Sequence, residues 1–367
     1  MLTTRGCQER LLSCFSEVEQ RRINDLRNNW KLLGRHPLIN LLFSEKDKFA
    51  SQRIVNLIKG FEYIRELDPG WQLSNDDKNR LLDTSVQTSN GIIGELLVYG
   101  YLAEVFRHSE RVPRAKTKTP DFKVSGNQNK AFSTSVSIEV HSKGWSSFMQ
   151  TKLENAETVV VKKLKNGVTS SLKSTELRPF STREVSHHTE DGISKLAQIG
   201  SKSCQIPAND AGIIWMNLDQ DDLNLSIQPG DCFPAYSLGS KSLESGIIWN
   251  ALYGMKNQFI YEGFPRRRPK VMQHDGLFAQ NPGLSAVVVS FYRHVVLFEN
   301  NSLQNPLPSW FREQVLNLRG FSWQSSWMIY PNSNFQLYIA SQLERLNDLV
   351  CLRPKTGIVY DHLDPKN

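Results

Sequence analysis

Two carboxylate residues stand 18 positions apart in a segment whose other residues predict short β-strands. Asp121 follows Thr119-Pro120, and Glu139 lies in the β-branched run Ile138-Glu139-Val140-His141. Because alternate side chains of a strand share a face, Glu139, His141 and Lys143 are predicted to point the same way. Carboxylate oxygens beside cations are the groups that hold a divalent metal ion against a phosphodiester. The segment therefore predicts metal-assisted phosphodiester hydrolysis.

A different interpretation of the same strand is structural. A half-exposed edge strand also carries polar residues on its solvent face, and it needs no site to explain them. A third carboxylate weighs against that alternative, because Glu95 lies in the apolar run Gly94-Glu95-Leu96-Leu97 of a predicted helix just upstream. Three acidic residues on neighbouring elements favour a site.

The positive charge of the chain is concentrated around these carboxylates. The chain has 367 residues and a formal net charge of +7. Residues 107–173 contain 13 Lys and Arg against 5 Asp and Glu, whereas the rest of the chain contains 31 against 32. A solvated basic face would explain this excess as well. A surface that attracts phosphate groups near the carboxylates explains both observations.

Composition restricts the class of protein. The 39% hydrophobic and 22% charged residues are typical of a globular chain. No apolar run approaches the roughly 18 to 20 residues that span a bilayer, and the first ten residues lack the apolar core of a signal peptide. The five cysteines form no C-x-x-C pair, which favours reduced thiols. We expect a cytoplasmic protein with no membrane partner.

The pattern of apolar residues predicts a mixed α/β fold. We expect an N-terminal helical region (1–74), a core (75–300) with a polar flap at 146–182, and a C-terminal helical extension (301–367). Within the core, the expected elements are a helix from 74 to 106, strands at 121–124 and 132–141, a helix from 181 to 202, a strand at 211–218 and a hairpin at 285–298. A further helix is expected near 335–349.

The motif Pro120-Asp121 followed by Glu139-Val140-His141 resembles the PD-(D/E)XK nuclease superfamily. This resemblance covers residues 90 to 220 at most and implies a restriction-endonuclease-like mixed sheet flanked by helices. It also implies that Asp121 and Glu139 bind Mg²⁺ or Mn²⁺ with the Val140 carbonyl, and that Glu95 is an accessory ligand. The implied activity is that of an endodeoxyribonuclease in defence or restriction.

The chain departs from the family at the third motif position, where His141 stands in place of the usual lysine. A neutral imidazole accepts a proton or binds a metal, and a protonated one replaces the lysine charge. Lys143 lies two residues further along the same face, roughly 6.6 Å away by strand rise. We expect His141 and Lys143 to share the catalytic role with Asp121 and Glu139. The alternative is a catalytically inactive nuclease-like module.

Further basic residues are candidate contacts with nucleic acid, DNA in preference to RNA. They are Lys116 and Lys118, close to Asp121, and the cluster Arg266-Arg267-Arg268. A solvated loop explains that cluster equally well. The inactive alternative binds nucleic acid or serves assembly in a larger complex, and protein partners or a second copy of the chain are compatible with either function.

Overall fold

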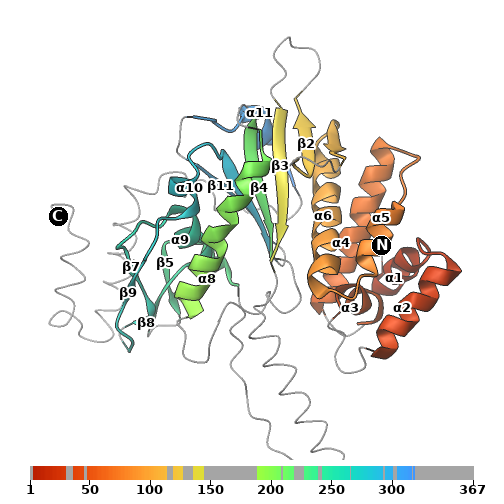
Figure 1. Ribbon diagram of the computed structural model, residues 1–367, viewed down its shortest axis with the longest axis horizontal. Coiled ribbons are helices and arrows are strands. Elements are labelled where there is room, and N and C mark those ends of the chain that lie inside the picture. Colours follow the sequence, from red (N-terminus) through yellow and green to blue (C-terminus); the bar gives the residue numbers. More distant parts are fainter. Residues whose placement is uncertain are drawn as a thin grey trace, which may run out of the picture.

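The described residues of the computed structural model form a mixed α/β fold around a six-stranded sheet (Figure 1). They comprise residues 3–29, 36–44, 48–113, 119–126, 135–143, 188–207, 210–218, 227–238, 242–264, 266–291, 294–300, 304–315 and 317–318. The strand order in this sheet is β1-β2-β3-β4-β10-β11. Strands β3, β4 and β10 are parallel to one another, and the outer pairings are antiparallel. The mixed sheet with flanking helices is as the sequence predicts.

The central strands are rich in Val and Ile, as expected for strands covered on both faces. They are β3 (Ser135–Ser142), β4 (Ala211–Asn217) and β10 (Ala286–Phe291). The outer strands are β1 (Ser109–Arg111), β2 (Phe122–Ser125) and β11 (His294–Glu299). Strands β10 and β11 form the hairpin expected at 285–298.

Helix α6 (Val86–Val105) covers one face of the sheet. Its residues Val98 and Leu102 pack in one apolar cluster with Val136, Ile138 and Val140 of β3. Helix α11 (Ser309–Val315) adds Phe311 to the same cluster. Residues near 311 are thus part of the core packing, although the sequence places them in the C-terminal extension. The helix expected near 335–349 lies outside the described residues.

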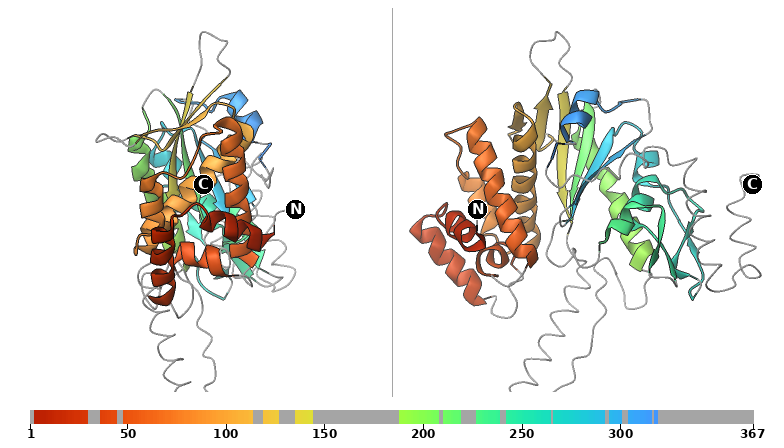
Figure 2. Two further views of the ribbon diagram at one scale, coloured as in Figure 1. Left: turned by 90° about the vertical axis from the view of Figure 1, so that its right-hand side faces the viewer. Right: turned by 180° about the vertical axis from the view of Figure 1, so that it is seen from behind.

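The opposite face of the sheet carries α8 (His188–Ala197) and α9 (Ile247–Tyr253) (Figure 2). Ile193 and Leu196 of α8 pack with Ile214 and Met216 of β4. The helix expected from 181 to 202 is shorter in the described residues, because the 3₁₀ helix η1 (Gln198–Gln205) replaces its end. Its expected start at Ser181, like the flap at 146–182, lies outside the described residues.

The N-terminal helices form a layer on the side of α6 that faces away from the sheet (Figures 1 and 2). They are α1 (Thr4–Leu12), α2 (Glu17–Asn29), α3 (Pro37–Phe43), α4 (Lys48–Leu67) and α5 (Asn75–Leu81). Helix α4 crosses α6 where Gly60 meets Gly100, and a Cβ atom built on Gly100 would lie 2.4 Å from the Gly60 Cα. Close approach of the two backbones is the physical reason for these glycines.

The prediction of a single helix from 74 to 106 is wrong, because the structure has two separate helices, α5 and α6, in this range. Each of the two helices begins at its own capping serine. Ser74 caps α5 by accepting a hydrogen bond from the Asp77 N–H, and Ser85 caps α6 by accepting one from Thr88. Between the helices, the His36 ring hydrogen-bonds to the Asp83 carbonyl and fixes the turn.

A smaller unit extends from the α8–α9 face. Strands β5 (Ala235–Leu238), β6 (Ser242–Ser245) and β8 (Glu262–Phe264) form a three-stranded sheet. Strands β7 (Phe259–Ile260) and β9 (Lys270–Val271) form a two-stranded one. The 3₁₀ helix η2 (Pro229–Cys232) and helix α10 (Leu277–Gln280) complete it. None of the described helices is both long and apolar enough to cross a membrane.

Candidate functional site

The register of β2 and β3 brings Asp121 beside Glu139. Phe122 pairs with Ile138 at the end of this antiparallel ladder, so one step further Asp121 stands opposite Glu139. The Asp121 carbonyl still accepts a hydrogen bond from the Val112 N–H at 2.9 Å, which continues the β1–β2 ladder through Asp121. Phe122 and Ile138 both face α6. Strand alternation therefore directs Glu139 to the opposite face, whereas Asp121 lies just before β2 and its carboxylate turns toward the backbone of β3.

The side chain of Asp121 ends the ladder with β3. Its Oδ2 accepts a hydrogen bond from the Val140 backbone N–H at 2.8 Å. A charged acceptor strengthens such a bond, and it fixes the half-buried carboxylate against the strand that carries Glu139. The Val140 side chain is buried in the cluster beneath α6.

Glu139 is buried on the face of the sheet that α8 covers. It pairs in register with Ile214, and His141 pairs with Met216, both of which pack with α8 residues. Only 5% of Glu139 is exposed. Its Oε1 accepts a hydrogen bond from Gln205 Nε2 at 2.8 Å. A buried carboxylate needs such donors, because burial without them disfavours the charged form.

Lysines lie on the elements that carry or cover the two carboxylates. Lys123 of β2 pairs in register with Ser137, and its Nζ is 3.7 Å from Asp210 Oδ2. Lys195 of α8 is half-buried, and burial together with the charge of Lys143 lowers its pKa from the ordinary 10.5 to about 8. The ammonium of Lys143 is thus close enough to affect Lys195. His141 and Lys143 are themselves half-buried.

Glu95 is engaged by two arginines. Arg80 donates to its Oε1 at 2.6 Å and to its Oε2 at 2.9 Å, and Arg111 donates to its Oε2 at 3.0 Å. Arg111 also binds both oxygens of the buried Asp77, at 2.7 and 2.8 Å. Burial acts to lower the pKa of both guanidinium groups, but the surrounding carboxylates raise it above the ordinary value. Glu95 therefore anchors guanidinium groups in this structure.

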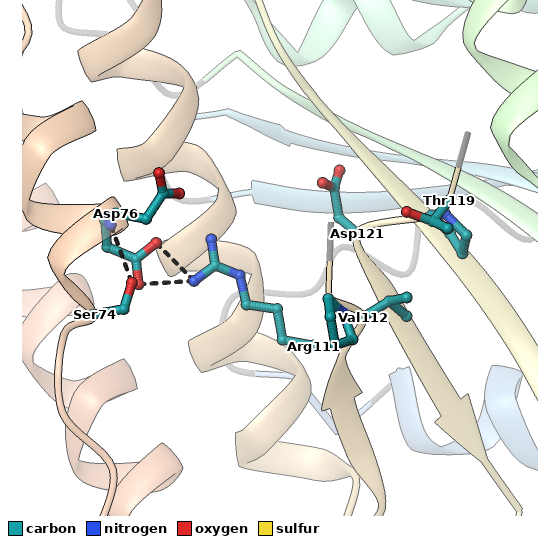
Figure 3. A pocket seen from close by; sticks show the side chains of 9 residues that line it. Ser74, Asp76, Arg111, Val112, Thr119 and Asp121 are labelled. Carbon is teal, nitrogen blue, oxygen red and sulfur yellow. Dashed lines mark hydrogen bonds and ion pairs between the residues drawn. The ribbon is translucent and has the colours of Figure 1, made fainter. Parts of the chain in front are cut away.

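A pocket of about 410 Å³ adjoins Asp121 (Figure 3). Its walls are formed by residues from the start of α5, the end of β1 and the segment before β2: Ser74, Asp76, Asp77, Arg111, Val112, Pro113, Thr119, Pro120 and Asp121. Figure 3 shows Arg111 extending toward α5 and Asp121 on the strand side. The arginine–carboxylate network thus connects the helical layer to the strands at the site.

The chemistry of the donor set decides which residues fit Mg²⁺. Mg²⁺ is typically bound by one or two carboxylates together with water, and Asp121 and Glu139, at facing positions one step beyond the β2–β3 ladder, are two such groups. Glu95 does not, because both of its oxygens accept from guanidinium groups. Within the described part of the chain, no group of three or more His, Cys, Asp or Glu side chains is arranged to hold a metal ion. The fit is thus to a two-carboxylate site.

The candidate contacts with nucleic acid are only partly described. Lys116 and Lys118 lie outside the described residues. Arg266, Arg267 and Arg268 are exposed in the connection after β8. Arg267 is 2.7 Å from Glu262, and the nearby Lys270 is 2.7 Å from Glu190. The local positive charge is thus reduced by these two ion pairs.

Sequence reasoning missed several residues of this site. Lys123 could have been found, because it lies two residues after Asp121 in the predicted strand. Gln205, Asp210 and Lys195 lie more than 50 residues beyond Glu139, and no local pattern links them to it. Only the packing of α8 and η1 on the sheet brings them there.

Comparisons with known proteins add no relative. No protein-family model, curated protein or solved structure matches this chain.

Proposed function

We propose that this chain is a metal-dependent nuclease with a restriction-endonuclease-like core, acting on phosphodiester bonds in DNA. The observation that carries the proposal is the β2–β3 register, which brings Asp121 to the position opposite Glu139, one step beyond the Phe122–Ile138 pair. The Asp121–Val140 hydrogen bond holds that carboxylate against β3. The choice of DNA, and a role in defence or restriction, rest on the motif resemblance alone.

Asp121 and Glu139 would hold the ion, together with the Val140 carbonyl. When bound, Mg²⁺ supplies a more acidic water and neutralises charge on the phosphate. Lys143 and Lys195 contribute positive charge on the same side of the sheet, where a phosphorane-like transition state accumulates negative charge. The half-buried His141 is placed two residues after Glu139 to accept or donate a proton.

A second function is favoured by two specific observations. His141 replaces the motif lysine, and Glu95 is bound by Arg80 and Arg111 instead of being available to a metal. Both features suit a nuclease-like module that binds nucleic acid without cleaving it. Lys123, Lys143 and Lys195 would then serve binding alone.

A plasmid-cleavage assay with Mg²⁺ or Mn²⁺ separates the two functions. For a nuclease, the parent chain cleaves, whereas Asp121→Ala and Glu139→Ala fall to the no-enzyme background. Asp25→Ala, on the exposed face of α2, makes the same chemical change away from the site and should cleave like the parent. Absence of cleavage of either DNA or RNA would overturn the nuclease proposal. Salt-sensitive binding that survives both substitutions would favour the inactive module.

A further inference from the structure

Three residues between the end of η1 and the start of β4 contact strands β3 and β4. Gln205 Nε2 donates to Glu139 Oε1 at 2.8 Å. The Ile206 side chain sits over Gly212, where a Cβ atom would come within 2.5 Å of Ile206 Cγ2. Asp210 accepts a hydrogen bond from Ser137 Oγ at 2.7 Å. One short segment thus contacts β3 before and after its contact with β4.

The three contacts have separable roles. Ile206 packs on Gly212 and Asp210 binds Ser137, and neither contact touches Glu139. Of these three contacts, the one that reaches the Glu139 carboxylate is made by the Gln205 side chain. Removing its amide therefore removes a donor from Glu139 and leaves the contacts of Ile206 and Asp210 in place.

This donor acts on the direction of the Glu139 carboxylate. Glu139 is 5% exposed, so water supplies few of its hydrogen bonds. A hydrogen bond on Oε1 fixes the rotation of the carboxylate and hence the direction in which Oε2 points. Groups that hydrogen-bond to a ligating carboxylate orient it, and their loss typically weakens metal binding 10- to 100-fold.

We propose that Gln205 is a positioning residue that orients the Glu139 carboxylate for a divalent metal ion. This inference rests on the proposed function, because it assigns the metal to Asp121 and Glu139. Gln205 touches neither substrate nor metal in this account. It acts through Glu139 only.

The test measures Mn²⁺ binding to the full chain by isothermal titration calorimetry, with Gln205→Met as the main variant. Methionine keeps the length of the side chain but cannot donate. The expected result is an approximately 10-fold increase in the Mn²⁺ Kd. At subsaturating Mn²⁺, kcat for DNA cleavage falls while KM for DNA stays the same. The matched control is Gln20→Met, because half-buried Gln20 donates to the Leu12 and Phe15 carbonyls, away from the site. It should bind Mn²⁺ like the parent.

Each outcome decides between the two proposals. If the parent chain binds no Mn²⁺, the proposed function and this inference fail together. If the parent binds Mn²⁺ and Gln205→Met binds it equally well, this inference alone fails. Should Gln205→Met not fold, Gln205→Asn provides the test, because its amide is one methylene too short to reach Glu139. It is expected to show the same loss, and parent-like Mn²⁺ binding by Gln205→Asn would overturn the inference.

Discussion

The lysines near the site lie in different electrostatic environments. Lys195 is half-buried on α8, and burial together with the charge of Lys143 lowers its pKa to about 8. Lys123 is instead close to a carboxylate, Asp210, at 3.7 Å. A lysine with a lowered pKa beside a second cation binds an anion well, because the anion relieves the repulsion. This arrangement suits a surface that meets phosphate groups.

The titration of Lys195 should be visible in the stability of the protein. The folded state disfavours the charged form, so the unfolded chain binds more protons between about pH 8 and the ordinary pKa of 10.5. The free energy of unfolding contributed by this group therefore rises with pH through that window. We expect the parent chain to gain stability relative to Lys195→Met between pH 8 and 10.5, measured by urea unfolding. Lys256→Met changes an exposed lysine and is the control. A constant difference between parent and Lys195→Met across this range would contradict the prediction.

At the scale of elements, α6 is the helix that packs against both the sheet and the N-terminal helices. Val98 and Leu102 pack against the sheet, whereas Ile92, Ile93 and Leu96 pack against the N-terminal helices. A helix that is apolar on several sides is buried on several sides. Its glycines are spaced to allow this. Gly94 meets Ser142 and Asn217 at the ends of β3 and β4, and Gly100 meets Gly60 of α4.

The glycines of α6 offer an internal comparison. Gly100→Ala would place a methyl group 2.4 Å from the Gly60 Cα, where only backbone can move. We expect it to lower the free energy of unfolding by about 1–3 kcal/mol. Gly91→Ala meets no described atom within 4 Å and should raise the free energy of unfolding by about 1 kcal/mol through helix propensity. Both are measured by denaturant unfolding. Equal effects of the two substitutions would show that helix propensity, and not the α4–α6 contact, determines these positions.

At the scale of the whole molecule, the candidate site lies where three parts of the fold meet. Strands β2 and β3 provide the carboxylates, α8 and η1 provide Lys195 and Gln205, and the helical layer reaches the site through Arg111. The exposed arginines after β8 belong to the smaller unit beside the start of α8, where Lys270 pairs with Glu190. A long polyanion bound at the site could therefore extend toward that unit along α8.

Salt dependence measures how many phosphates this surface contacts. If Arg266 and Arg268 each contact one phosphate, the double variant Arg266→Ala/Arg268→Ala should reduce the slope of log K against log [salt] by about 2 for duplex DNA. The measurement is fluorescence anisotropy over a series of salt concentrations. Arg21→Ala/Arg22→Ala removes the same charge from exposed α2 residues and should leave the slope as in the parent. An unchanged slope in the Arg266→Ala/Arg268→Ala variant would show that these arginines contact no phosphate and that the loop is only solvated.

The sequence by itself determined the central elements and one face of the site. The Val- and Ile-rich runs predicted β3, β4 and the β10–β11 hairpin to within a few residues, because such runs form strands wherever both faces are covered. Alternation placed Glu139, His141 and Lys143 on one face, since that relation depends on backbone geometry alone. The break between α5 and α6 was missed, although Ser85 is a good capping residue. Helical periodicity on both sides concealed it.

Only the tertiary structure decided which residues meet across the sheet. Asp121 stands opposite Glu139 because the β2–β3 ladder has one register, and no local pattern in the chain specifies that register. Glu95 pairs with Arg80 and Arg111 because α5, α6 and β1 converge. For this reason the proposed metal site does not include Glu95. Gln205 reaches Glu139 from 66 residues downstream because Ile206 packs on Gly212. Contacts between distant segments follow from the packing of whole elements, and sequence spacing cannot supply them.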